Sequence, residues 1–137
     1  MVALLTVLTL VGSMPTLLWH TREFTRPHVA LERYIAARDA DFVLVDTDPP
    51  KTATDGQWAI NAVDQVRNDP DLTNRPLRFS SRAMDLRLTA KLCELGSVSV
   101  VSRQEMRRLG FGLNVPVLNP RFEQLTLVLE QGGCLVR

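Results

Sequence analysis

Two carboxylates, Asp46 and Asp48, are the residues of this chain best placed to do chemistry, because they directly follow the apolar run at residues 42–45. A short β-branched run with acidic ends is typical of a strand buried on both faces of a parallel sheet. Ligands of such sheets collect at the carboxyl ends of the strands. Paired carboxylates at that position can hold a divalent cation that carries a phosphate. We therefore take Asp46 and Asp48 as the first candidate ligand-binding residues.

The surrounding sequence departs from the known metal sites of this kind. The pair is similar to the Asp-x-Asp site of nucleotide-sugar transferases and to the strand-end aspartates of haloacid-dehalogenase phosphatases. Pro49 and Pro50 stand where the phosphatases carry a small residue and a threonine, and the apolar run at 98–101 leads into Ser-Arg-Gln, not into a second acidic pair. The simpler interpretation is that Asp46 ends a strand and Asp48 begins a turn. We expect no bound metal, no cofactor and no catalytic residue.

A second candidate site is a polar stretch that contains Arg67, Asn68, Asp69 and Arg75. Its two arginines can bind a carboxylate or a phosphate through paired hydrogen bonds. The alternative is a pair of turns in which Asn and Asp side chains bond their own backbone and the arginines pair with neighbouring aspartates. Trp58 is a third candidate, since an indole can stack on a sugar ring, although a single tryptophan is more often part of a core.

The remaining residues that could take part in chemistry give little support to several classes of function. His20 and His28 have no acidic or cysteine partner nearby in the sequence, so structural roles are expected. Cys93 and Cys134 lack the spacing of a metal site. They form either one disulfide in an oxidising compartment or a buried thiol and a free one. A net charge of +1 with 6% aromatic residues gives little support for nucleic-acid binding.

The elements that must position these residues alternate between helix and strand. The spacing of Leu31 and Ile35 predicts a helix that opens at 25–27. Apolar runs predict strands at 42–45, 77–79 and 98–101, and a last strand at 125–129. Helices are predicted at 57–67, at 84–95 before Gly96, and after a capping box formed by Ser102 and Glu105. This order indicates a small α/β domain with a mostly parallel sheet and flanking helices.

The first nineteen residues differ from everything after them. Residues 1–19 carry no charge, and all 16 Lys and Arg and all 15 Asp and Glu follow them. A spanning helix needs about 20 apolar residues, so we predict a transmembrane helix at 1–19 and a soluble domain at 20–137. No Lys or Arg precedes the apolar run, which is unlike a signal peptide. It resembles the last helix of a multi-pass protein with Met1 internal; a buried element of a soluble fold is the alternative.

Several of these stretches together resemble the C-terminal soluble portion of bacterial multi-pass membrane proteins of glycosyltransferase-like type. The resemblance covers roughly residues 20–112 and rests on the segments 40–46, 64–70, 75–76 and 92–93, with a tryptophan between the first two. It implies that the tail follows the last membrane helix and lies outside the cytoplasm. It also implies that the catalytic acid of the parent protein lies near the start of a longer chain. The flanking Arg22 and Arg26 favour the cytoplasmic side instead.

The sequence therefore predicts a supporting domain that is not catalytic alone, at the cell inner membrane and extracytoplasmic. Its expected partners are membrane lipid through residues 1–19 and a glycan or lipid-linked sugar, with no nucleic acid. One alternative is a metal-dependent phosphatase or nucleotide-sugar enzyme that uses Asp46 and Asp48. Another is a membrane-anchored interaction module.

Overall fold

The fold is a small α/β domain built on a parallel sheet. The computed structural model describes residues 25–48, 66–111 and 118–136. A helix over residues 25–36 comes first. The elements that follow are β1 (Phe42–Val45), β2 (Leu77–Ser80), the 3-10 turn η2 (Ser81–Ala83), α3 (Leu86–Leu95), β3 (Val98–Val101), α4 (Arg103–Arg108) and α5 (Pro120–Gln131).

The three strands run parallel in the order β2-β1-β3. Phe42 stands beside Leu77 on one side and beside Val98 on the other, so the strand ends lie level with one another. The C-terminal tail adds one parallel bridge, between Leu135 and Val98, to the outer edge of β3. All three carboxyl ends therefore meet at one edge of the sheet, which is the edge where ligands bind in such folds.

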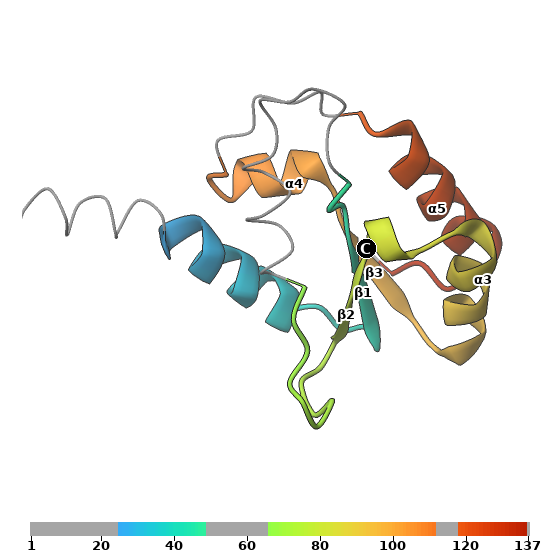
Figure 1. Cartoon of the computed structure of the whole chain (residues 1–137), viewed down its shortest axis with the longest axis horizontal. Helices are drawn as coiled ribbons and strands as arrows, with labels where there is room; N and C mark the ends of the chain where they lie inside the picture. The colour runs from blue at the N-terminus through green and yellow to red at the C-terminus, as the bar shows by residue number, and fades with distance from the viewer. Residues whose placement is uncertain (1–24, 49–65, 112–117, 137) are drawn as a thin grey trace, which may run out of the picture.

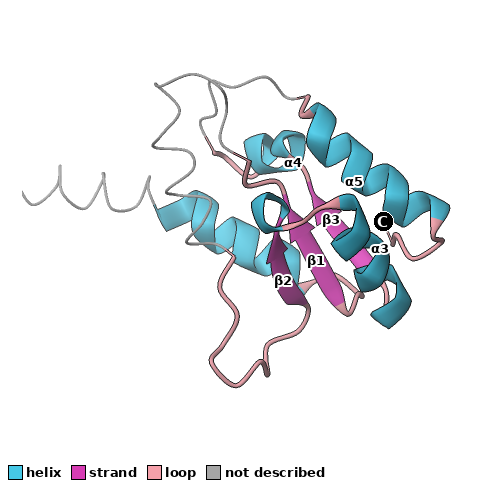
Figure 2. Cartoon of the chain, turned by 45° about the vertical axis from the view of Figure 1, so that its right-hand side comes forward, coloured by secondary structure: helices cyan, strands magenta, loops and turns pink. Residues whose placement is uncertain are grey.

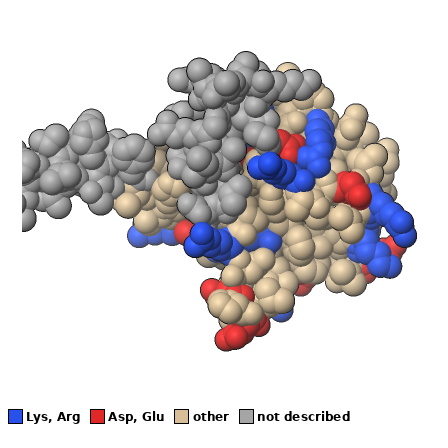
Figure 3. Space-filling model, in the orientation of Figure 1, with Lys and Arg blue, Asp and Glu red and all other residues tan. Residues whose placement is uncertain are grey.

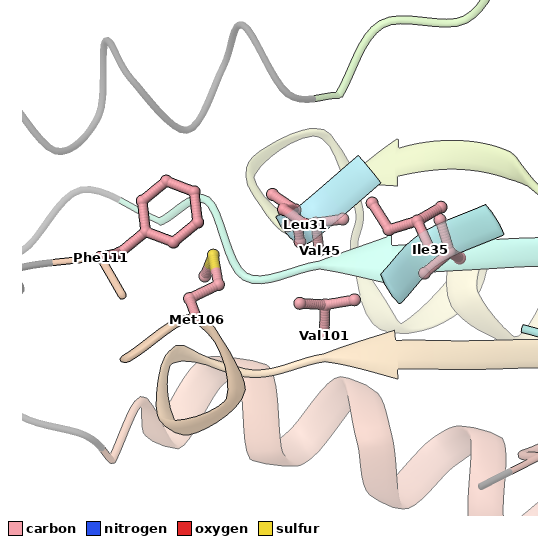
Figure 4. Packing of buried hydrophobic residues seen from close by; sticks show 7 residues of the cluster. Leu31, Ile35, Val45, Val101, Met106 and Phe111 are labelled. Atoms are coloured by element: carbon pink, nitrogen blue, oxygen red, sulfur yellow. The ribbon is translucent and has the colours of Figure 1, made fainter. Parts of the chain in front are cut away.

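Helices cover both faces of this sheet (Figures 1 and 2). On one face the helix at 25–36 and α4 enclose a cluster that includes Leu31, Ile35, Val45 and Met106 (Figure 4). Successive strand residues point to opposite faces, so Leu44 joins the other cluster, with α3 and α5. That cluster holds Leu92, Phe122, Leu125 and Leu129 among its members. The predicted α/β class with a parallel sheet and flanking helices is confirmed.

Local signals set several element boundaries, and the capping box at Ser102 and Glu105 is formed as predicted. Asp85 accepts a hydrogen bond from the Leu88 N–H at 2.7 Å and caps the start of α3. Ser102 and Glu105 form the capping box of α4, with the Ser102 N–H donating to the Glu105 carboxylate at 2.7 Å. A cap of this kind satisfies backbone donors that have no partner within the helix.

The predicted last strand at 125–129 is wrong, because these residues belong to the helix α5. Phe122, Leu125 and Leu129 recur at helical spacing and all three are buried against the sheet. Pro120 occupies the first turn of α5, where its missing N–H removes no hydrogen bond. The burial of these three side chains on one face of a helix outweighs the strand preference of the Leu-Thr-Leu-Val-Leu run.

Two other predictions lie wholly or mostly outside the described residues, and the structure decides a third. Most of the predicted helix at 57–67 lies outside them, and residues 66 and 67 are not helical. The predicted membrane span at 1–19 also lies outside them, and among residues 25–48, 66–111 and 118–136 no helix has the length and apolar character to cross a bilayer. The two cysteines, whose state the sequence left open, form a disulfide between Cys93 of α3 and Cys134 of the tail.

Candidate functional site

Asp46 and Asp48 lie together at the carboxyl end of β1, the central strand. The Asp46 N–H donates to the Val101 carbonyl at 3.0 Å, which continues the β1–β3 ladder by one residue and fixes the backbone there. Asp46 is 1% exposed and Asp48 is 8% exposed. Their position is the one expected for a strand-end site, and their burial means that the surrounding side chains decide what they can do.

Three of the four carboxylate oxygens accept a side-chain hydrogen bond, and the fourth, Asp46 Oδ2, lies at ion-pair distance from a guanidinium group. Arg103, the first residue of α4, places its Nε 3.2 Å from Asp46 Oδ2. Asn119 donates to Asp46 Oδ1 at 2.8 Å and to Asp48 Oδ2 at 3.1 Å. Arg121 on α5 donates to Asp48 Oδ1 at 2.5 Å. The four oxygens thus serve an internal network that holds the start of α5 against the sheet.

The network is nearly balanced in charge, since two guanidinium groups face two carboxyl groups. Burial raises the pKa of Asp46 from its ordinary 3.8 to about 6, because a buried carboxylate loses its hydration. The Arg103 charge and the Asn119 hydrogen bond act against this rise, and the neighbouring Asp48 charge adds to it. Asp46 therefore changes its protonation close to neutral pH, within an enclosed site.

Hydroxyl groups from the end of β2 and the start of η2 complete the same edge. The Ser81 hydroxyl oxygen accepts a hydrogen bond from the Thr47 N–H at 3.0 Å. The Thr47 and Ser80 hydroxyl groups are hydrogen-bonded to each other. These contacts tie β2 to the Asp46–Asp48 segment.

The chemistry of this donor set does not fit a divalent cation. Magnesium and calcium bind clusters of oxygen ligands, whereas two arginines and an asparagine amide already surround these carboxylates. Over the described ranges 25–48, 66–111 and 118–136, no group of three His, Cys, Asp or Glu side chains is arranged to hold a metal ion. The arrangement is instead that of a buried ion-pair network.

The polar stretch after residue 66 folds into a loop at the opposite, amino end of β2. Asn68 pairs with the outer edge of β2: its amide donates to the Arg78 carbonyl at 2.9 Å, and its side-chain oxygen accepts from the Arg78 N–H at 2.7 Å. The side-chain amide thus takes the place of a neighbouring strand. Asn74 accepts from the Asp69 N–H at 3.0 Å, which closes the loop.

In this loop the Arg75 side chain and the Arg67 backbone both make hydrogen bonds within the domain. Arg75 donates to the carbonyls of Leu72 and Asn74, at 2.8 and 3.2 Å. The Arg67 carbonyl accepts from Arg78 at 3.3 Å. Four of the predicted site residues, Arg67, Asn68, Asp69 and Arg75, thus lie in one loop, away from Asp46 and Asp48. Trp58 lies outside the described residues.

Sequence reasoning missed the three partners of the aspartates, Arg103, Asn119 and Arg121. Arg103 comes shortly after a predicted strand, as residues at the carboxyl edge of a sheet do. Asn119 precedes a proline, as residues at the start of a helix often do. Those were the only local signals, because the contacts join residues 55 to 73 positions apart. Asn119 stands at the N-cap of α5 without capping it, since its side chain bridges the two aspartates instead.

A wide groove lies elsewhere on the described surface. This groove, of about 940 Å³, runs between the outer edge of β3, α4 and α5, and neither Asp46 nor Asp48 lines it. On the face shown in Figure 3, acidic and basic side chains are interspersed on the described surface and form no broad patch of one sign.

No protein-family model, no curated protein and no solved structure matches this chain.

Proposed function

We propose that this chain is a supporting, non-catalytic α/β domain of a larger bacterial inner-membrane protein of glycosyltransferase-like type. The observation that carries the non-catalytic role is that Asn119 and Arg121 hydrogen-bond three of the four oxygens of Asp46 and Asp48, while Arg103 pairs by charge with the fourth. A nucleophile or a metal ligand needs an open coordination position or an approach for substrate. The domain would instead contact a glycan, a lipid-linked sugar or a partner polypeptide.

Two features support a tethered domain outside the cytoplasm. Residues 1–19 are uncharged and long enough for one membrane span. The Cys93–Cys134 disulfide is typical of an oxidising compartment. Arg22 and Arg26, which follow the apolar segment, instead favour the cytoplasmic side of the membrane for the domain. We give the disulfide more weight, because two arginines beside one segment set the orientation of a longer protein only weakly.

The test of the non-catalytic role compares the full chain in detergent micelles with its Asp46→Asn variant. Both are assayed with Mg²⁺ for phosphate release from p-nitrophenyl phosphate and for hydrolysis of a nucleotide-diphosphate sugar. We expect the two proteins to show the same background. Mg²⁺-dependent turnover that Asp46→Asn abolishes would establish the alternative, an enzyme that uses the Asp46/Asp48 pair.

The tether is tested separately by alkaline carbonate extraction of membranes from cells that express the full chain. We expect the chain in the membrane pellet. Release into the supernatant would show that residues 1–19 pack within a soluble fold. Maleimide labelling of intact cells, before and after a membrane-impermeant reductant, then reports on which side of the membrane Cys93 and Cys134 lie.

A further inference from the structure

The outer edge of β3 is only half covered by the chain's own tail. Backbone groups of Val98 point away from β1: its N–H donates to the Cys134 carbonyl at 2.9 Å, and its carbonyl accepts from the Val136 N–H at 2.9 Å. Because the direction of backbone groups repeats every second residue of a strand, the N–H and carbonyl of Val100 face the same way. Neither has a hydrogen-bond partner among the described residues.

This open half of the edge lies in the groove of about 940 Å³. Val100, Leu135 and Val136 contribute apolar lining on the sheet side, and Phe122 contributes it from α5. Along α5 the wall presents Glu123, Leu127 and Glu130 at helical spacing, and Leu127 is 51% exposed. The opposite wall comes from α4, including Arg108, and from Arg38, which follows the helix over residues 25–36 and is paired with Glu105.

We propose that this groove binds an extended peptide segment of a partner polypeptide, which adds to the sheet beside Val100. The peptide would carry apolar and basic side chains on the face that meets α5, and polar side chains on the face that meets α4. This inference deepens the supporting role proposed above and rests on its partner contacts, not on the membrane tether.

Hydrogen-bond geometry is the reason for an extended occupant. A strand edge offers N–H and carbonyl groups at a spacing that only another extended backbone matches. The tail already pairs with Val98 in this way, so the outer edge of β3 accepts an extended backbone at Val98, the first residue whose backbone groups face outward. On the other side of the sheet, Asn68 satisfies the equivalent groups of Arg78 with its side chain. Uncovered edges of this kind are where proteins recruit strands from other chains.

Charge and apolar surface specify the side chains of the occupant. Glu123 makes no ion pair within the described part of the chain, and it flanks the exposed Leu127 on the wall that a bound strand would face. A basic residue beside an apolar one on the peptide would match both. The net charge of the whole chain is +1, so nonspecific attraction does not favour a basic peptide.

The binding test uses the full chain in nonionic detergent and a fluorescein-labelled octapeptide that alternates Lys and Val with intervening threonines, Lys-Thr-Val-Thr repeated twice. We expect a saturable rise in anisotropy that empty micelles do not give. Glu123→Lys should weaken binding by roughly threefold or more, the size of a partly exposed ion pair. The matched control is Glu94→Lys on α3, an exposed glutamate outside the groove, which should leave binding unchanged.

Amide hydrogen exchange tests the strand pairing itself. Peptide at saturation should protect the Val100 N–H by roughly tenfold or more, as a newly formed backbone hydrogen bond does, and should leave the Ser99 N–H, which faces β1, unchanged. Val100→Pro removes the outward donor without touching the β1 ladder and should abolish binding. Should that variant not fold, the exchange result on the unmodified chain decides.

Three results would overturn the proposal. They are the absence of saturable binding, equal binding of the peptide with glutamate in place of lysine, and binding without protection of Val100. None of these bears on the Mg²⁺-dependent assay, so failure of this inference and failure of the non-catalytic role are distinguishable.

Discussion

Replacing Asp46 with asparagine tests the electrostatic account of the buried site, because burial and the ion pair predict opposite effects of pH. Asparagine keeps an oxygen that can accept from Asn119 and removes the titrating proton. In the folded chain the pKa of Asp46 is raised to about 6, above its ordinary value of 3.8. The folded state therefore keeps a proton that the unfolded chain releases between these two pH values. Stability contributed by protonated Asp46 is complete below pH ~4 and is lost as the pH rises to ~6.

The size of this effect follows from the difference between the two pKa values. One pKa unit corresponds to about 1.4 kcal/mol, so a difference of about two units corresponds to ~3 kcal/mol in the free energy of unfolding. Asp46 is 1% exposed, so solvent screening reduces this figure little. We expect the stability difference between the natural chain and Asp46→Asn to fall by about this amount from pH 4 to pH 7.

Urea unfolding followed by circular dichroism, repeated across this pH range, measures the difference directly. Asp41→Asn is the matched control at the opposite end of β1. Asp41 is exposed, and hydrogen bonds from the Ser97 N–H and hydroxyl lower its pKa. Its contribution is therefore present above pH ~4 and is lost as the pH falls further, the opposite direction. A stability difference for Asp46→Asn that grows from pH 4 to pH 7 would refute the reasoning, since it would mean that Arg103 outweighs burial.

Three further variants test the packing of the domain by urea unfolding. The double variant Cys93→Ser/Cys134→Ser opens a loop with a sequence separation of 41 and should lose about 4 kcal/mol; a reductant that leaves the unfolding midpoint of the natural chain unchanged would contradict this. Leu125→Ala, at a position 1% exposed between α5 and the sheet, should lose roughly 2–5 kcal/mol, and a loss no larger than that of an exposed Leu95→Ala would argue against α5 packing there. Ser102→Ala removes the cap of α4 and should lose about 1 kcal/mol, whereas no loss would mean that the capping box is not formed.

The parts of the fold that sequence predicts are those with a strong local signal. The strand at Phe42–Val45 was predicted because an apolar run bounded by aspartates suits a strand covered on both faces, and the structure covers both faces of β1. The bonds of the Ser102 capping box mark the start of α4 within a few residues, and Gly96 directly follows the end of α3. In each case the physical cause lies within a few positions of its effect.

The parts that sequence does not predict depend on distant contacts. Residues 125–129 suit a strand by composition, and only the burial of Leu125 and Leu129 against the sheet makes the helix the better choice. Asp46 and Asp48 were found from the sequence, but Arg103, Asn119 and Arg121 reach them from other elements. The interpretation of the pair as ligands or as part of an internal network depends wholly on those partners.

The most direct test of the central claim, that the two aspartates serve this network and not a metal, is thermal unfolding of the full chain with and without millimolar Mg²⁺. A cation bound only to the folded state at a hundredfold excess over its dissociation constant would add about 2.7 kcal/mol of stability. The account predicts the same small change, or none, for the natural chain and for Asp46→Asn. A rise in the unfolding temperature that Asp46→Asn abolishes would contradict it.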